Sequence, residues 1–169
     1  MRVLVVSDSH TDVDTMDMVV RKMSSNMVIH LGDHIVDAVL LQARHPDMLI
    51  ECIKGNCDTN SDRPREKLLR VGSTTIFMTH GDEYRVEEGL NELITAGKRS
   101  GAGLILFGHT HTPLLYEIHG ITVMNPGRIG RKSSKIIDAT FGLVDTDAEG
   151  TLRCSIVRFD SIAGENTEA

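Results

Sequence analysis

The sequence predicts an α/β protein, a layered β-sandwich with helices on its outer faces. The first two-thirds of the chain alternates short apolar runs with amphipathic stretches, as βαβ units do. The later part holds pairs of apolar runs separated by tight turns, which is typical of β-hairpins. A length of 169 residues suits one hydrophobic core. We therefore expect a single domain over residues 1–163 and a polar tail over residues 164–169.

The early elements follow from the spacing of apolar residues. Residues 2–6 form an apolar run that predicts a buried strand. Val13, Met16, Val20 and Met23 recur every three or four residues, which predicts a helix with one apolar face. The same reasoning predicts strands over residues 27–31 and 48–53, with a helix over residues 35–44 between them.

The later elements include three hairpins. They pair residues 68–71 with 75–79 and 114–118 with 121–124, and the last runs over residues 140–159 with a turn at 147–150. Between the first two hairpins, a helix is marked by the apolar positions Val86, Leu90, Leu93 and Ile94, and it ends near Gly97 or Gly101. Residues 104–107 predict another buried strand.

Composition narrows the class of protein. The formal net charge of −6 argues against a general nucleic-acid binder, so we expect nucleic acid only as a phosphoester substrate. No apolar run approaches the roughly 20 residues that span a bilayer, and the first residues lack the pattern of a signal peptide. Cys52, Cys57 and Cys154 form no CxxC pair, which fits reduced thiols in the cytoplasm. The sequence leaves a homo-oligomer open.

Residues able to bind metal follow five of the predicted strands, usually beside a glycine. If these strands have the same polarity in one sheet, their ends converge on one crevice, where open α/β sheets bind ligands. Glycine at these places fits a backbone that turns sharply and approaches another group closely. The candidate ligands are Asp8, His10, Asp33, Asn56, His80, His109 and His111.

The ligand types indicate two transition-metal ions. Carboxylates, imidazoles and an amide oxygen suit Mn²⁺, Zn²⁺, Fe or Ni²⁺. Seven ligands are too many for one ion but suit two ions roughly 3.5–4 Å apart that share a carboxylate. Two divalent ions would leave the site positive after the charges of Asp8, Asp33 and a bridging hydroxide are subtracted, which favours a phosphoester anion as the substrate.

The order of these motifs resembles the calcineurin-like metallophosphoesterase family, and within it the small bacterial and archaeal phosphodiesterases. The resemblance covers residues 1 to about 130 and rests on Asp8-Ser9-His10, Gly32-Asp33, Gly55-Asn56-Cys57-Asp58, His80-Gly81-Asp82, Gly108-His109-Thr110-His111 and Asn125-Pro126-Gly127. The resemblance implies a β-sandwich flanked by helices. It also implies a metal-dependent phosphodiesterase activity, with phosphomonoesters as an alternative substrate class.

The resemblance also implies a role for each ligand. Asp8, His10 and His111 would bind the first metal ion, Asn56, His80 and His109 the second, and Asp33 both. The ions would usually be Mn²⁺, with Ni²⁺, Zn²⁺ or Fe as alternatives. A hydroxide activated by the two ions would attack phosphorus, and the residues expected at the reacting phosphate are Asp33, Asn56, His80 and His109.

Two positions depart from the family pattern. Cys57 stands where many relatives have a histidine that assists the leaving group, and a thiol is a poor substitute near neutral pH. We therefore expect a slow enzyme or a bias toward esters with good leaving groups. Val36 stands where many relatives place an acid, and Asp37, one position later, receives no role.

The other histidines and arginines have simpler interpretations. His30 is expected to be a hydrogen-bonded core residue or to support a ligand. The sequence leaves His34 open, with contact to the rim of the site as one alternative. His45 and His119 are expected to face solvent. The arginines near the predicted loops are expected on a solvated surface, with contact to substrate phosphate as the alternative: Arg63, Arg65, Arg128 and Arg131.

Two rival functions are open. One is a non-catalytic interaction scaffold on the same fold, like the retromer subunit that resembles this family; that subunit lacks several of the ligand histidines, whereas all are present here. A two-metal peptidase would cleave an aminoacyl amide and leave aryl phosphates intact.

Overall fold

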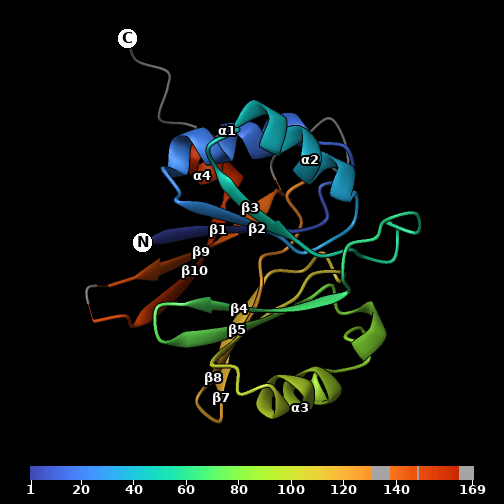
Figure 1. Cartoon of the computed structure of the whole chain (residues 1–169), viewed down its shortest axis with the longest axis vertical. Helices are drawn as coiled ribbons and strands as arrows, with labels where there is room; N and C mark the ends of the chain where they lie inside the picture. The colour runs from blue at the N-terminus through green and yellow to red at the C-terminus, as the bar shows by residue number, and fades with distance from the viewer. Residues whose placement is uncertain (131–137, 148, 164–169) are drawn as a thin grey trace.

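The computed structural model describes residues 1–130, 138–147 and 149–163. Two five-stranded sheets lie face to face, with helices on both outer sides, so that the chain forms four layers (Figure 1). This architecture confirms the predicted helix-flanked β-sandwich.

The first sheet has the strand order β10-β9-β1-β2-β3. Its strands are β1 (Arg2–Val6), β2 (Met27–His30), β3 (Leu49–Cys52), β9 (Thr140–Thr146) and β10 (Leu152–Arg158). β1, β2 and β3 are parallel, and β9 pairs antiparallel with both β1 and β10. The carboxyl ends of the three parallel strands therefore lie at one edge.

The second sheet has the order β4-β5-β6-β8-β7. Its strands are β4 (Glu66–Val71), β5 (Thr74–Thr79), β6 (Leu104–Leu106), β7 (Leu114–Ile118) and β8 (Ile121–Asn125). β5, β6 and β8 are parallel, while β4 and β7 are antiparallel to their neighbours. The turn between β7 and β8 has φ values of 52° at His119 and 75° at Gly120, as a type I′ turn requires.

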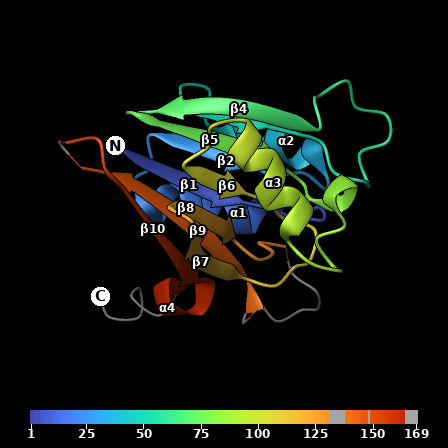
Figure 2. The ribbon, with the colours of Figure 1, turned by 90° about the horizontal axis from the view of Figure 1, so that it is seen from below.

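Helices cover the two outer faces. α1 (Val13–Met23), α2 (Ile35–Arg44) and α4 (Phe159–Ala163) lie over the first sheet. The 3-10 turn η1 (Asp82–Tyr84) leads toward α3 (Asn91–Arg99), which lies over the second sheet (Figure 2). No helix in the described ranges has the length and apolar character needed to cross a membrane.

The alternation of strand side chains separates three apolar layers. In β1, Val3 and Val5 face the second sheet, whereas Leu4 and Val6 face the helices of the first. A third layer joins the second sheet to α3 through residues such as Phe77 and Leu93. Each fully buried side chain of this size contributes roughly 1.5–3 kcal/mol through its burial. The two sheets are thereby held in a fixed relation, which fixes the site at their edge.

Three expectations need correction. The ligand-bearing strands do not share one sheet: three lie in the first and two in the second. The helix predicted from Val86 begins at Asn91, because residues 85–88 form turns and Gly89, with a φ of 156°, is not helical. The last hairpin stops at Arg158, and a short helix, α4, follows from Phe159. The predicted tail, residues 164–169, lies outside the described residues.

Candidate metal centre

The loops that follow β1, β2, β5 and β6 bring their polar side chains to one place between the two sheets. Asp8, His10 and His111 have ligand atoms within 4.8 Å of one another, and so do Asp8, Asp33 and His80. Asp8 belongs to both groups. The expected convergence of strand ends therefore occurs, although it draws on two sheets rather than one.

The remaining two predicted ligands border the second group. The amide oxygen Oδ1 of Asn56 lies 3.2 Å from His80 Nε2. The backbone N–H of His109 donates to Asp8 Oδ2 at 3.2 Å, and the His109 ring centre lies 5.1 Å from that of His80. The structure thus brings all seven predicted residues together.

The backbone at the site is unusual. Left-handed φ values, between 44° and 67°, occur at the predicted ligands Asp8, His10, Asp33, His109 and His111. Asp and His tolerate this region better than most residues, yet it normally costs about 1–3 kcal/mol per residue. Such concentrated strain is typical of functional sites.

Glycines at the site are required by close approach. A Cβ atom on Gly55 would lie 2.2 Å from Asp33 Oδ1, and one on Gly108 would lie 2.0 Å from Ser7 Oγ. The backbone of each loop therefore passes directly over the side chains of another. This contact explains why glycine accompanies the predicted ligands.

One acceptor that the sequence left unidentified is the backbone carbonyl of Leu31. His80 Nδ1 lies 2.8 Å from Leu31 O and donates to it. The other ring nitrogen, Nε2, faces the site, where it lies 3.4 Å from Asp33 Oδ1. A buried histidine held in this orientation can offer Nε2 to a cation.

Asp37, which received no role from the sequence, supports the first loop. Its Oδ2 accepts hydrogen bonds from Ser9 Oγ at 2.6 Å and from Thr11 N at 2.7 Å. Ser9 Oγ also lies 3.0 Å from His30 Nε2, while His30 Nδ1 accepts from Gly32 N. His30 is thus the buried, hydrogen-bonded residue that was expected. The sequence signal that could have indicated this supporting role was the presence of an acid, Asp37, within the otherwise apolar run 35–41.

Asp58 and Asn125 fix two other loops. Asp58 accepts from the backbone N–H of Gly55 and of Ile35, the first residue of α2. Asn125 donates to Gly108 O at 2.7 Å and to Thr110 Oγ1 at 3.1 Å. Both residues belong to the motifs that carried the resemblance, and their contacts give those motif positions a structural reason.

The charges at the site depend on one another. Burial raises the pKa of Asp8, but its ion pair with His111 and the nearby His80 outweigh burial and bring that pKa below the ordinary value. The ion pair with Asp8 in turn raises the pKa of His111. Burial lowers the pKa of His10, and it lowers that of His30 to about 4, so His30 is neutral at pH 7.

A metal ion fits these residues. Asp8 is fully buried, and its Oδ1 accepts no hydrogen bond from the described residues, although His111 Nε2 lies 3.2 Å away. Leaving a buried carboxylate oxygen without a donor costs several kcal/mol unless a cation faces it. Ligand atoms that each lie about 2.1 Å from one ion are roughly 3.0–3.4 Å apart. The neighbouring pairs here, at 3.2–3.4 Å, match that spacing.

Comparison with known proteins decides the family. A sequence model described as the calcineurin-like phosphoesterase superfamily domain matches residues 1–149. The chain is also 33% identical over 132 residues to the probable metallophosphoesterase YsnB of Bacillus subtilis (strain 168), covering 76% of this chain and 75% of that protein. The chain belongs to the calcineurin-like phosphoesterase superfamily.

Further relatives and structural neighbours cover most of the chain. Phosphodiesterase MJ0936 of Methanocaldococcus jannaschii is 24% identical over 164 residues, 87% of this chain and 94% of that protein. The structure of a predicted phosphoesterase from Streptococcus pneumoniae TIGR4 superposes with a TM-score of 0.76 at 25% identity, covering 94% of this chain and 90% of that chain. The structure of Vps29 of Entamoeba histolytica, solved with Zn²⁺, shares the fold at a TM-score of 0.68 and 20% identity. The match covers 94% of this chain and 99% of that chain.

The two departures from the phosphoesterase motifs are visible in the structure. The Cys57 thiol donates to Asp33 Oδ2 at 3.1 Å, and burial together with that carboxylate raises the thiol pKa to about 11. Val36 is 62% exposed and contributes nothing to the ligand loops. Asp37, one position later, points inward instead.

The histidines outside the ligand set are placed as follows. The ring of His34 lies 5.0 Å from that of His10, at the rim of the phosphoesterase site. His119 is exposed, as expected. The expectation for His45 was wrong: its Nε2 lies 2.6 Å from Asp17 Oδ1, and the side chain is 18% exposed because α1 packs over it.

The arginines divide between ion pairs and surface positions. Arg65 contacts Asp82 and Glu83, and Arg128 lies 3.9 Å from Asp138. The positive charge of Arg128 partly opposes the rise that Asp8 causes in the pKa of His111. Arg63 is exposed. Arg131 lies outside the described residues.

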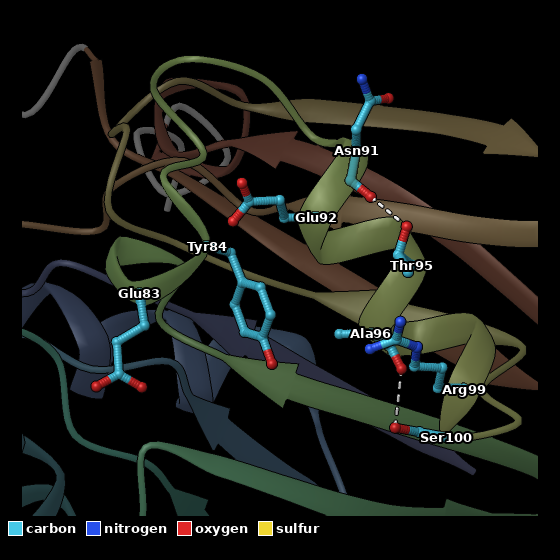
Figure 3. Close-up of a pocket in the computed structure, with 8 residues that line it drawn as sticks. All are labelled: Glu83, Tyr84, Asn91, Glu92, Thr95, Ala96, Arg99 and Ser100. Carbon is cyan, nitrogen blue, oxygen red and sulfur yellow. Dashed lines mark hydrogen bonds between the residues drawn. The ribbon is translucent and has the colours of Figure 1, made fainter.

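A cavity of about 620 Å³ lies between η1 and α3 (Figure 3). No predicted metal ligand lines it. The hydroxyls of Thr95 and Ser100 donate to backbone carbonyls of the same helix, and the Tyr84 hydroxyl donates to Glu66. These three hydroxyls are thus already engaged, and we place no phosphoesterase function there.

Proposed function

We propose that this protein hydrolyses phosphodiesters with the help of two divalent metal ions. The carrying observation is the Asp8 carboxylate, which belongs to both groups of ligand atoms and has a buried oxygen, Oδ1, that accepts no hydrogen bond from the described residues and lies 3.2 Å from His111 Nε2. In the proposed assignment, Asp8, His10 and His111 hold one ion, Asn56, His80 and His109 hold the other, and Asp33 contacts both. Mn²⁺ is the expected metal.

When bound, such ions supply positive charge for the phosphate oxygens and acidify a water molecule for attack on phosphorus. The protein's own part is to hold its donors in place. His80 is fixed by Leu31 O, and the first loop is fixed by Asp37. The exposed Asn56 amide, next to His80, is placed to orient a phosphate oxygen.

The leaving group receives little help from the residue at position 57. The Cys57 thiol already donates its proton to Asp33 Oδ2. We therefore expect the enzyme to prefer esters with good leaving groups, such as aryl esters. The phosphodiesterase name of the M. jannaschii relative supports diesters as the substrate class. The free thiols of Cys52, Cys57 and Cys154 support a cytoplasmic location.

A substrate panel tests the proposal. Wild-type protein, stripped of metal and reloaded in turn with Mn²⁺, Ni²⁺, Zn²⁺ or Mg²⁺, is assayed on bis(p-nitrophenyl) phosphate and p-nitrophenyl phosphate. We expect hydrolysis of the diester, highest with Mn²⁺, and about two ions per chain by elemental analysis. Asp33→Asn and His109→Ala should each lower kcat/KM at least about 100-fold.

The matched controls are Asp47→Asn and His119→Ala, which change an exposed acid and an exposed turn histidine. Both should keep wild-type turnover. Near-normal turnover of Asp33→Asn and His109→Ala would contradict the proposal. Metal content alone does not exclude the scaffold alternative, because a Vps29 structure was solved with Zn²⁺. Stoichiometric metal without hydrolysis of any ester would favour the scaffold.

A further inference from the structure

An apolar cavity of about 410 Å³ borders the His109 side of the metal centre. Its apolar walls are Val86, Leu90, Phe107 and Leu114. Thr110, which also lines it, stands between the predicted ligands His109 and His111 in the chain.

Glu87 ties the same cavity to the site through space. Its carboxylate lines the cavity, and its Oε1 lies 3.6 Å from His109 Nε2. The cavity and the centre therefore share a border.

The fold holds this cavity in a fixed shape. Phe107 and Val86 are 1% and 6% exposed and belong to the apolar layer beneath α3. Leu90 and Leu114 are half-buried and pack against that layer. Thr110 is fixed by its hydrogen bond from Asn125. The volume lies within the roughly 300–1,000 Å³ of small-molecule sites, whose linings are mostly apolar.

We propose that this cavity receives one uncharged aryl arm of a phosphodiester whose phosphate lies at the metal centre. The inference rests on the proposed function and names its substrate class. A diester carries two organic arms on one phosphate, so an arm directed past His109 enters the cavity. Its carbon-rich walls favour an aromatic ring, and the Glu87 carboxylate disfavours an arm that carries negative charge.

A contrasting cavity on the His10 side supports this choice. It measures about 390 Å³, and it is lined by His34, which contacts His10, and by Cys57, which contacts Asp33. Its remaining walls are the apolar Ile35 and Val36 and the polar Asp58, Thr59, Asn60 and Ser61. This lining is more polar than the one beside His109, so an aryl arm is better accommodated beside His109.

Direct binding of two diesters whose leaving groups, phenoxide and methoxide, are poorer than p-nitrophenoxide tests the inference. Diphenyl phosphate and dimethyl phosphate share the monoanionic phosphate but differ in their arms. Calorimetric titration of Zn²⁺-loaded protein should give a Kd for diphenyl phosphate at least about tenfold below that for dimethyl phosphate. In NMR spectra of methyl-labelled protein, the methyl resonances of Leu90 and Leu114 should shift when diphenyl phosphate is added. They should remain unchanged when dimethyl phosphate is added.

Leu114→Gln and Leu115→Gln form a matched pair. Adjacent residues of β7 point to opposite faces, and Leu115 does not line the cavity. Leu114→Gln should narrow the affinity ratio of the two diesters to about threefold or less, and Leu115→Gln should retain the full ratio. The methyl shifts in unsubstituted protein provide the test even if Leu114→Gln folds poorly.

Equal affinity for the two diesters in the wild type would overturn the inference, as would equal narrowing in both variants. Either result leaves hydrolysis of bis(p-nitrophenyl) phosphate, and so the proposed function, intact. Conversely, selective binding of diphenyl phosphate by a protein that hydrolyses no ester in the metal panel would refute the proposed function while retaining the cavity as a binding site.

Discussion

Replacing Gly55 with alanine should damage the centre without changing any ligand. Gly55 lies in the loop after β3, against the side chain of Asp33. A Cβ atom here would lie 2.2 Å from Asp33 Oδ1 and 2.7 Å from Asp33 N. Real Cβ atoms essentially never approach closer than 3.0 Å. The clash therefore requires a movement of the carboxylate, of the loop or of both.

The size of the effect follows from these distances. To restore ordinary contact, Asp33 Oδ1 must move by roughly 1 Å, and a displacement of that size at a catalytic group lowers activity about 100-fold. Because a backbone atom is also too close, rotation of the side chain alone does not relieve the strain. Overpacking of this kind costs about 1–3 kcal/mol of unfolding free energy.

Two measurements examine the result. Urea unfolding of metal-free protein gives the loss of stability, and kcat/KM on bis(p-nitrophenyl) phosphate gives the loss of activity. Gly103→Ala is the matched control, because its new methyl would meet only the Thr74 Cγ2 methyl at 3.0 Å, and it should cost less than about 1 kcal/mol. Wild-type stability and turnover in Gly55→Ala would refute the argument that close approach requires glycine here.

Three further outcomes are expected. Asp37→Ala should lower the unfolding free energy by about 2–3 kcal/mol in urea titrations, because the Thr11 N–H loses its acceptor. Burial raises the pKa of Asp17, but hydrogen bonds from Arg21 and His45 outweigh it, so the folded pKa lies below the unfolded one. The resulting stability is present above about pH 4 and is lost as pH falls further, so Asp17→Asn should destabilise the protein at pH 7 and little at pH 2.5. Equal loss at both pH values would contradict this. Mn²⁺ at 100 times its Kd should raise the unfolding free energy by about 2.7 kcal/mol, and an unchanged thermal midpoint after metal addition would count against specific binding.

Much of the fold could be predicted because apolar periodicity reports burial directly. The runs ending before Asp8 and Asp33 are strands with both faces covered, and they stand out as continuous apolar segments. The gathering of the ligands followed from their positions at strand ends. The division of strands between two sheets could not be predicted in this way, because periodicity does not state which strands pair.

Contacts between distant segments also escaped prediction. Asp37 supports the first loop and His45 pairs with Asp17 only because α1 and α2 pack side by side. The start of α3 was misplaced because Val86 is buried, and so matches the apolar spacing, while lying in the turn that follows η1. In each case tertiary packing determined what local spacing left open.

The origin of the centre in two sheets divides its chemistry along the polypeptide. Of the seven predicted ligands, residues up to 56 provide every oxygen donor and one imidazole, and residues 80–111 provide the other three imidazoles. A chain severed between β3 and β4 would yield two fragments, each with an incomplete and inert half of the centre. The downstream fragment would still carry β9, whose natural neighbour is β1 in the upstream one. Fragment complementation would then proceed through that strand pair, and recovered turnover would report reassembly of the two halves.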